Sequence, residues 1–326
     1  MSTILVTGAA GFIASRVARK LLENGESIVG VDNINDYYDK KLKHHRLNEL
    51  KEFPNFTFYK TDIENMEALS DVFLKHKIDK IINLAARAGV RYSIKNPHVY
   101  LATNAHGTLN LLELMREHSI QKMVLASSSS LYAGQKMPFT EDLPVNTPIS
   151  PYAVTKKAAE VLAYSYHYLF GLDITVLRYF TVYGPAGRPD MSYFRFIKWI
   201  DEGKELILYG DGEQRRDFTY VDDIVDGTIK ALKPIGYEII NLGNNHPHNM
   251  LEMISIIEKG LGKKAEIKHM PVQKADATAT WANITKAKRL LDWEPKVSLE
   301  EGIEKTIQWY YANRDLVGKL EIDMSV

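Results

Sequence analysis

Short apolar runs alternate with segments of helical periodicity through the first half of the chain. The apolar runs of strand length read TILVT, SIVGVD, FTFYKTD, KIINLAA, MVLASS and ITVLRYF. Between them, the pattern predicts helices over residues 12–24, 66–76, 97–118 and 151–170. Strands that alternate with helices indicate βαβ units, and strands that are apolar almost throughout are typical of a sheet covered on both faces. The sequence therefore predicts an α/β fold with a doubly wound parallel sheet of the Rossmann type.

The pattern loosens after residue 180, where the short strands ELILYG, EIINLG and AEIKHM mix with helices, Pro and Gly. This change predicts a dinucleotide-binding domain over residues 1–180 and a smaller C-terminal α/β domain, which binds the substrate, over residues 181–326. The boundary is soft. The pattern leaves open that part of residues 215–245, including EIINLG, packs back on the sheet of the first domain.

Composition narrows the choice of partners. The 326 residues are 45% hydrophobic and 25% charged, as in ordinary globular proteins, and the formal net charge is zero. A neutral chain gives no indication of a nucleic acid or an anionic membrane as partner. There are no cysteines, which excludes disulfides and thiolate chemistry. The first predicted strand begins directly after the N-terminus without a signal peptide or anchor, so a cytoplasmic location is expected.

Two glycines, Gly8 and Gly11, follow the first predicted strand in the stretch VTGAAGFIA. A turn without Cβ atoms allows backbone N–H groups and the N-terminus of the next helix to approach a pyrophosphate. The third small position is Ala14, where many such motifs have glycine, and alanine still permits close packing of the helix on the strand. A glycine-rich turn alone also fits a purely structural turn.

Small or acidic residues follow the next predicted strands, at the edge of the sheet where a dinucleotide binds. The second strand ends in Asp32, whose carboxylate suits a ribose diol and repels a 2′-phosphate, which favours NAD over NADP. Asp32 by itself also fits a helix or turn cap. Asp62 and Ile63 follow the third strand and residues 84–86 follow the fourth. Together these positions predict an NAD site.

The stretch SPYAVTKKAAE predicts a helix that begins with Ser150 as N-cap and Pro151 at the first helical position. Tyr152 and Lys156 then lie four residues apart, on one face of the helix. A free phenol is a poor base at neutral pH, but a neighbouring ammonium and a positive nicotinamide ring lower its pKa. A Tyr-x-x-x-Lys pair is common on helix surfaces, but here it follows the strand that ends in four serines, residues 127–130. This order favours a catalytic pair.

Five motifs, TGAAGFIA, NLAARAGV, SSSSLYA, YAVTK and RYFTVYGP, occur in this order over essentially the whole chain. In these motifs the chain resembles the extended short-chain dehydrogenase/reductase superfamily. The resemblance implies a catalytic set of Ser128, Tyr152 and Lys156, a sugar-nucleotide substrate, and a homodimer formed through two helices of each subunit. It also implies an NAD site formed by Gly8, Gly11, Phe12, Ile13, Asp32, Asn33, Asn35, Asp62, Ile63, Leu84, Ala85, Ala86, Asn104, Tyr152, Lys156 and Tyr179.

The residues after Ser128 bear on the reaction. Dehydratases that resemble this chain carry Asp and Glu there, whereas this sequence has Ser129 and Ser130. Uncharged hydroxyls do not supply efficient acid catalysis near neutral pH, which argues against dehydration. An epimerase needs only the Ser/Tyr/Lys set and the nicotinamide: the C4 hydroxyl is oxidised, the 4-keto sugar turns over, and the hydride returns to its other face.

Further motifs, NINDYYD, AGVRYSIKNPHVY, GRPDM, RRDFTYVDDI and DWEPKVSLEEGI, resemble those of UDP-glucuronate 4-epimerases. A 4-keto uronate is a β-keto acid that loses CO₂ when its carboxylate bond aligns with the ketone π system, so an epimerase has to hold the carboxylate out of alignment. Candidate neutral donors to that carboxylate are Ser129, Ser130 and Thr181. Arg188 is a candidate charged donor, although it also fits a surface loop.

The resemblance assigns Arg216 to the diphosphate and Asp276 to the uridine ribose, with Gln273 as in the uronate group. Lys274 and Ala275 stand where that group usually has Pro-Gly, which puts the shape of this loop in doubt.

The sequence thus predicts an NAD-dependent UDP-glucuronate 4-epimerase that retains its cofactor. Three alternatives remain open: a UDP-glucose/UDP-galactose 4-epimerase, a UDP-glucuronate decarboxylase, and a non-catalytic NAD-sensing module. An intact Ser/Tyr/Lys set argues against the last of these. No metal site is predicted. The adjacent His44 and His45 would point apart on a helix, and His246 and His248 lack acidic or cysteine companions.

Overall fold

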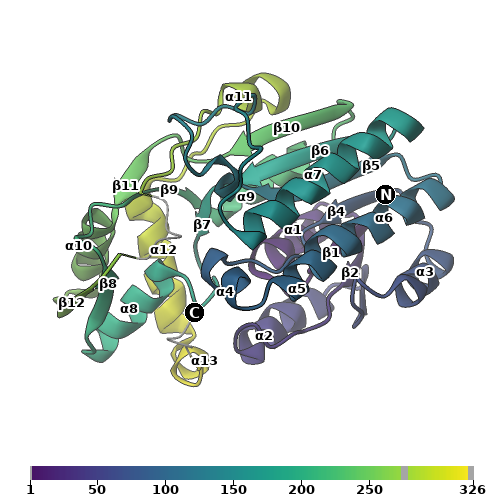
Figure 1. Ribbon diagram of the computed structural model, residues 1–326. Helices are drawn as coiled ribbons and strands as arrows, with labels where there is room; N and C mark the ends of the chain where they lie inside the picture. The colour runs from purple at the N-terminus through teal and green to yellow at the C-terminus, as the bar shows by residue number, and fades with distance from the viewer. Residues whose placement is uncertain (1, 273–277, 322–326) are drawn as a thin grey trace.

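A seven-stranded parallel sheet with the strand order β10-β6-β5-β4-β1-β2-β3 forms the centre of the molecule (Figure 1). The computed structural model describes residues 2–272 and 278–321. The strands of this sheet are β1 (Thr3–Thr7), β2 (Ser27–Val31), β3 (Phe56–Tyr59), β4 (Lys80–Asn83), β5 (Lys122–Ser128), β6 (Asp173–Tyr179) and β10 (Tyr237–Leu242). The strand order reverses between β1 and β4, so a crevice opens there at the carboxyl ends of the strands. The predicted doubly wound fold is confirmed.

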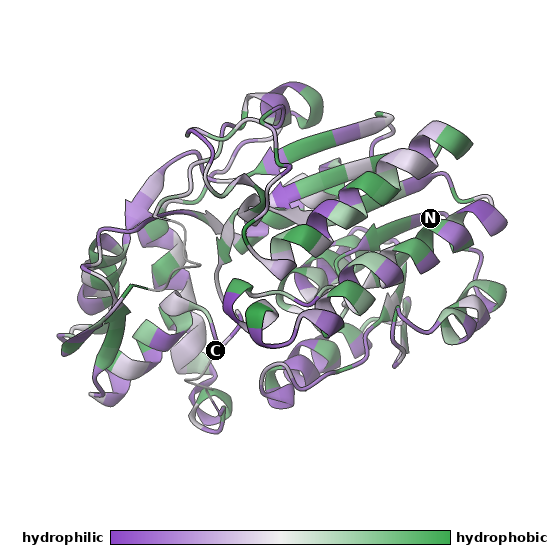
Figure 2. Ribbon diagram, in the orientation of Figure 1, coloured by the Kyte–Doolittle hydropathy of each residue, from purple (hydrophilic) through white to green (hydrophobic). Residues whose placement is uncertain are grey.

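Helices cover both faces of the sheet because successive residues of each strand point to opposite sides. Leu5 of β1 packs in one cluster with α3, α6 and α7, whereas Ile4 and Val6 pack with α1, α2 and α9. These helices are α1 (Phe12–Glu23), α2 (Lys40–Lys51), α3 (Met66–Lys75), α6 (Gly107–Glu117), α7 (Pro151–Phe170) and α9 (Val221–Lys230). In Figure 2 the strands between the two helical layers are largely hydrophobic and the outer helix faces more polar. This is the pattern of a sheet buried on both sides.

After β6, the described residues 180–272 and 278–321 form two small sheets and, besides α9, five further helices. The three-stranded sheet has the order β11-β9-β7 and the two-stranded sheet consists of β12 and β8. Their elements are β7 (Thr181–Tyr183), β8 (Leu206–Tyr209), β9 (Arg215–Tyr220), β11 (Pro247–Asn249), β12 (Ile267–Met270), α8 (Ser192–Glu202), α10 (Met250–Leu261), α11 (Thr285–Leu291), α12 (Leu299–Ala312) and α13 (Arg314–Gly318). β10 belongs to the central sheet, where Ile240 pairs with Leu177 of β6. The division into two domains at residue 180 stays a prediction.

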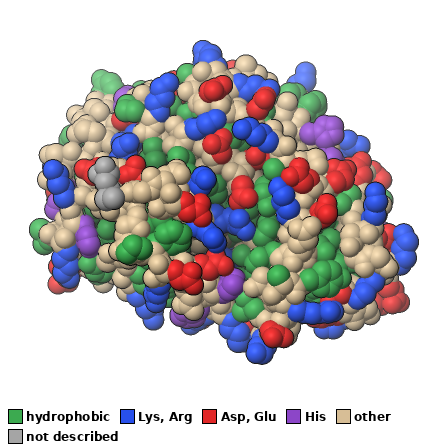
Figure 3. Space-filling view, turned by 180° about the vertical axis from the view of Figure 1, so that it is seen from behind, with side chains coloured by type: hydrophobic (Ala, Val, Ile, Leu, Met, Phe, Trp, Pro, Cys, Tyr) green, Lys and Arg blue, Asp and Glu red, His purple; other side chains and the backbone are tan. Residues whose placement is uncertain are grey.

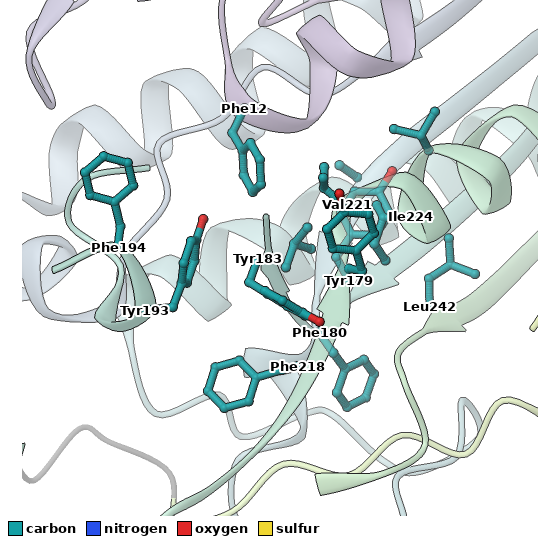
Figure 4. Close-up of a cluster of buried hydrophobic side chains, with 14 of the residues drawn as sticks. Phe12, Tyr179, Phe180, Tyr183, Tyr193, Phe194, Phe218, Val221, Ile224 and Leu242 are labelled. Carbon is teal, nitrogen blue, oxygen red and sulfur yellow. The ribbon is translucent and has the colours of Figure 1, made fainter. Parts of the chain in front are cut away.

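An aromatic cluster joins this region to helix α1 (Figure 4). Phe12 of α1, Tyr183 of β7, Tyr193 of α8 and Phe218 of β9 all belong to one buried cluster. The rings of Tyr183 and Tyr193 lie 6.0 Å apart between centroids in an edge-on arrangement. This shared core fixes α8 and β9, which border the cleft described below, against the glycine-rich turn.

Two of the predicted helices differ in outcome. The helix over residues 151–170 is confirmed as α7, with the Ser150 side chain accepting the N-terminal hydrogen bond from Ala153. The helix predicted over residues 97–118 is interrupted, because α5 (Pro97–Tyr100) continues into a π-helical turn, η1 (Leu101–His106), before α6. A short helix, α4 (Val90–Lys95), precedes them. Across residues 2–272 and 278–321, we find no helix with the length and apolarity needed to span a membrane.

Candidate active site

A cleft of about 560 Å³ lies along the carboxyl ends of the central strands. Its walls come from the loops after β1 to β4, from the serine end of β5, from α7, and from residues of β7 to β9. Figure 3 shows basic side chains gathered in a hollow near the middle of the back face of the molecule. Residues of both the glycine-rich turn and the serine tract line this cleft, so the two motifs belong to one site.

The glycine-rich turn after β1 lies against the loop after β4. Gly8 has a φ of 71°, and a Cβ atom at this position would lie 2.9 Å from the backbone nitrogen of Ala85. The Gly11 N–H donates to the Gly8 carbonyl at 2.7 Å, and Gly11 is the N-cap of α1 without a capping side chain. The open N-terminus of α1 therefore faces the cleft with its positive dipole end, as a pyrophosphate requires.

Asp32 organises the turn after β2. Its carboxylate accepts hydrogen bonds from the backbone N–H groups of Ala10 at 3.1 Å and Ile34 at 2.7 Å. Asp32 therefore caps this turn, as the alternative interpretation expected, and its side chain also lines the cleft. Its role in binding a ribose diol stays a prediction. The Asn33 amide in turn donates to Asp62 at 2.5 Å, which ties the ends of β2 and β3 together.

The serine tract ends β5 and starts a short 3₁₀ turn, η2 (Ser129–Tyr132). The Ser128 side chain accepts a hydrogen bond from the Ser130 N–H and donates one to the Ser130 hydroxyl, both at 3.1 Å. Burial raises the pKa of Tyr152, while its hydrogen bond with Ser128 and the positive charge of Arg188 lower it. Ser130 and Tyr152, which are both predicted to act on the sugar, are thus linked through Ser128.

Lys156 lies below Tyr152 on the same face of α7 and is 4% exposed. Its ammonium donates to the carbonyl of Ala126 in β5 at 2.8 Å. Burial lowers the pKa of Lys156 to about 8, and the carboxylate of Glu160 counteracts this shift. The ammonium is therefore still the main form at neutral pH, but its pKa lies close enough to neutrality for nearby charges to alter its protonation.

Arg188 lines the cleft and is held by an acidic neighbour. Its guanidinium donates to both oxygens of Asp190, at 3.0 and 2.5 Å, and lies 5.4 Å from the centre of the Tyr37 ring. Despite the burial of the group, the Asp190 charge raises the pKa of Arg188. The interpretation as a surface loop cation is wrong. A role of Arg188 in binding the substrate carboxylate stays a prediction. That carboxylate would have to compete with Asp190 for the guanidinium.

Most of the predicted site residues line the cleft. These are Gly8, Gly11, Phe12, Ile13, Asp32, Asn33, Asn35, Asp62, Ile63, Leu84, Ala85, Ala86, Ser128, Ser129, Ser130, Tyr152, Lys156, Tyr179, Thr181, Arg188 and Arg216. Asn104 lies behind the wall instead, where its side chain bonds the backbone of Arg87 and the hydroxyl of Thr155. It thereby fixes the loop after β4 to α7. The predicted residues Gln273 and Asp276 fall outside the described residues.

Comparison with known proteins fits this geometry. Residues 5–306 match the GDP-mannose 4,6 dehydratase family. The chain belongs to this family of extended short-chain dehydrogenase/reductases. The resemblance predicted from the motifs is confirmed.

Individual relatives cover the whole fold. The chain is 57% identical to a UDP-glucuronate 4-epimerase of Thermodesulfobacterium geofontis, over 99% of this chain and 100% of the relative. It is 40% identical to the crystal structure of UDP-glucuronic acid 4-epimerase from Bacillus cereus in complex with UDP-glucuronic acid and NAD, with a TM-score of 0.89 over 95% of this chain and 99% of that one. A UDP-glucose 4-epimerase of Thermotoga maritima, solved with UDP-glucose, is 33% identical, with a TM-score of 0.88 over 96% and 99% of the two chains.

Sequence reasoning missed several cations that this member of the short-chain dehydrogenase/reductases brings into the cleft. They are Lys43, Arg87, Arg91 and Arg195. Burial lowers the pKa of Lys43 to about 8, although the charge of Asp32 opposes this, and the Nε of Arg87 has no hydrogen-bond partner within the described part of the chain. Cations that line a cleft in this way suit the negative charges of a dinucleotide and a nucleotide sugar. Lys43 was missed because KLKHHRL has the composition of a solvent-exposed helix face.

Proposed function

We propose that this protein interconverts UDP-glucuronate and UDP-galacturonate by NAD-dependent epimerisation at C4. The observation that carries the proposal is one cleft that combines a glycine-rich dinucleotide turn, the Ser128/Tyr152/Lys156 set and neutral hydroxyls at Ser129 and Ser130. The 57% identity to a UDP-glucuronate 4-epimerase over nearly the whole chain supports the same activity, and solved relatives contain NAD. The sequence-based predictions of a UDP-glucuronate 4-epimerase and of NAD as its cofactor are confirmed.

In this proposal the protein contributes a base, a charge and a shaped site. Tyr152, with Ser128 as hydrogen-bond partner and Lys156 below it, accepts the proton of the sugar O4 and later returns it. NAD, which Gly8, Gly11 and Asp32 would hold, would supply a hydride acceptor for C4 and a donor for its return, without net reduction. Between the two transfers the 4-keto sugar presents its opposite face, and the hydroxyls of Ser129, Ser130 and Thr181 hold the carboxylate out of alignment with the ketone.

Dehydration is disfavoured although the matched family is named after a dehydratase. At the two positions after Ser128, this chain has Ser129 and Ser130, and the Ser130 hydroxyl accepts a hydrogen bond from the Ser128 hydroxyl. Neither of them is able to act as an efficient acid or base near neutral pH. The described residues also contain no group of three or more His, Cys, Asp or Glu able to hold a metal ion.

The first test is direct incubation of the purified protein with UDP-glucuronate, without added reductant, followed by anion-exchange separation of the products. UDP-galacturonate formed without net NADH is the expected result. Formation of a UDP-pentose and CO₂ instead would show that the carboxylate is released. No turnover of UDP-glucuronate together with activity on UDP-galactose would assign the protein to the neutral-sugar epimerases, as in the Thermotoga maritima relative.

An Arg188→Ala variant is expected to lose at least about tenfold more kcat/KM with UDP-glucuronate than with UDP-glucose. The physical reason is that a charged donor favours a carboxylate over a hydroxymethyl group. An Arg289→Ala variant, which removes an exposed arginine of α11, serves as control and should leave both values unchanged. Equal losses of Arg188→Ala on the two substrates would mean that Arg188 does not read the carboxylate.

We further propose that two copies of the chain associate through α7. Val154, Val161 and Tyr168 recur every seven residues and are 48%, 51% and 77% exposed, which makes an apolar stripe along the outer face of the helix. Leu101 and Ile149 extend this apolar surface and are each 56% exposed. Size-exclusion chromatography with light scattering should give twice the mass of one chain. Val161→Glu, which places a charge in the apolar stripe, should give the mass of a monomer. A wild-type mass of one chain would refute the homodimer.

A cytoplasmic location stays a prediction.

A further inference from the structure

A buried ion pair lies directly beneath the catalytic residues, between Glu160 of α7 and Arg178 of β6. Both side chains are 1% exposed. Arg178 donates from Nε and from one terminal nitrogen to the two carboxylate oxygens of Glu160, at 2.8 and 2.7 Å. This two-pronged geometry fixes the carboxylate in the plane of the guanidinium.

The pair is built into the register of the sheet. Arg178 is the cross-strand neighbour of Ser127 in β5, and the Ser127 hydroxyl donates to the same Glu160 carboxylate at 2.7 Å. Along the strands, the inward residues on this face change from apolar, Met123 and Leu125, to polar at Ser127. Glu160 therefore bonds to both strands at the point where the serine tract begins.

The same helix face carries the catalytic residues. Tyr152, Lys156 and Glu160 follow each other at intervals of four residues and so project from one side of α7. Three consecutive residues of β5 bond to them: Ala126 to Lys156, Ser127 to Glu160, and Ser128 to Tyr152. Glu160 adds an ion pair to these contacts, with Arg178 of β6. A slip of the helix along the strands would break it.

Further groups fix the arginine from other elements. Another nitrogen of Arg178 donates to the Tyr132 hydroxyl at 2.7 Å, and this hydroxyl donates to Asn241 of β10 at 2.8 Å. The charged or titratable groups that face the pair are Lys157 of α7, whose ammonium lies 3.7 Å from Glu160, Tyr132 of η2, Glu141 of the following loop and Tyr237 of β10. The serine turn, the catalytic helix and both neighbouring strands therefore meet at one polar junction.

We propose that the Glu160–Arg178 pair is a positioning device that holds α7 at a fixed depth and rotation against β5 and β6, and with it Tyr152 and Lys156. A buried ion pair adds little net stability compared with apolar residues of the same volume, because both charges lose their hydration. Its specific effect is geometric, since only one placement of the helix satisfies the carboxylate. The carboxylate also supports the ammonium of Lys156, whose pKa is otherwise lowered by burial.

Three variants separate geometry from charge. Glu160→Gln keeps the shape and removes the negative charge, Arg178→Lys keeps the charge without the planar fork, and the double variant Glu160→Gln/Arg178→Met leaves no unpaired charge in the core. The matched control is the double variant Lys122→Met/Asp173→Asn. Lys122 and Asp173 form an ion pair across the same two strands in register, but at their amino ends, away from the cleft.

The inference rests on the proposed function for its kinetic readouts, so the wild type is assayed first on UDP-glucuronate, UDP-glucose and UDP-galactose. We expect the Glu160 variants to lose about ten- to hundredfold in kcat with KM and NAD content within about twofold of the wild type. Deprotonation of Lys156, whose pKa is about 8, should make kcat/KM of the wild type fall at alkaline pH. In Glu160→Gln this fall should move to lower pH by about one unit, because Lys156 loses its nearby negative charge. Arg178→Lys should recover part of kcat.

Hydrogen–deuterium exchange of the first two turns of α7 supplies a readout that does not depend on turnover. Exchange there should rise about tenfold or more in the Glu160→Gln/Arg178→Met variant and stay unchanged in the Lys122→Met/Asp173→Asn control. Inactivity of the wild type on all three sugars would refute the proposed function, and exchange would still decide the inference. Glu160 variants with wild-type kcat, pH profile and exchange, and only a lower melting temperature, would overturn the positioning role.

Discussion

A Tyr152→Phe variant is expected to lose at least about a thousandfold in kcat for UDP-glucuronate, equivalent to about 4 kcal/mol of transition-state stabilisation. The substitution removes the phenolic oxygen that accepts the O4 proton. It leaves the ring, which packs edge-on to Tyr100 with 6.1 Å between centroids, so the fold of the site is preserved. NAD released by acid from the purified variant should therefore equal that of the wild type. Turnover is measured by anion-exchange separation of the two uronates.

The control for this variant is Tyr164→Phe, which changes an exposed tyrosine of the same helix outside the cleft. It should retain full kcat. A Tyr152→Phe variant with a rate near that of the wild type would exclude Tyr152 as the base. Loss of NAD together with activity would mean that the hydroxyl holds the cofactor rather than the sugar proton.

Lys156→Met is expected to lower kcat about hundredfold and to change the pH profile. Burial lowers the pKa of Lys156 to about 8, against the opposing charge of Glu160. The ammonium is thus present below this pH and is lost as the pH rises through it, so kcat/KM of the wild type should fall above about pH 8. In Lys156→Met that alkaline fall should be absent, because the group that titrates is gone. The measurement is kcat/KM for UDP-glucuronate over about pH 6 to 10.

Lys122→Met is the matched control, since Lys122 is also a buried lysine of lowered pKa but lies at the far end of β5. It should lower the melting temperature and leave the pH profile intact. The same alkaline fall in Lys156→Met as in the wild type would show that another group titrates.

The catalytic helix was predictable because its signals are local. Ser150 caps the N-terminus, Pro151 occupies the first helical position and Gly171, at a φ of 70°, ends the helix. Each acts within one turn of a helix end, Ser150 through its side chain and Pro151 and Gly171 through their backbone geometry. The glycine-rich turn was predictable for the same reason, as Gly8 requires a positive φ next to a neighbouring loop.

The cations of the cleft were not predictable because they meet only after folding. Lys43 lies on α2 and Arg87 follows β4, and nothing in either segment indicates that their charges lie close enough for that of Arg87 to lower the pKa of Lys43. The pairing of Arg188 with Asp190 is local, yet the sequence alone does not show that both turn into the cleft. The π-helical turn at residues 101–106 likewise left no mark in the apolar pattern of residues 97–118.

The place of β10 in the central sheet has a consequence for how the chain is made. β10 pairs with β6 from Ile174 to Tyr179, but it is translated only after β7, α8, β8, β9 and α9. Until Leu242 has emerged from the ribosome, β6 is an open edge with unpaired N–H and C=O groups, of the kind that templates aggregation. A nascent chain that stops before Tyr237 is therefore expected to need a chaperone rather than to wait as a finished nucleotide-binding unit. Residues 181–236 are therefore synthesised before the central sheet can be completed.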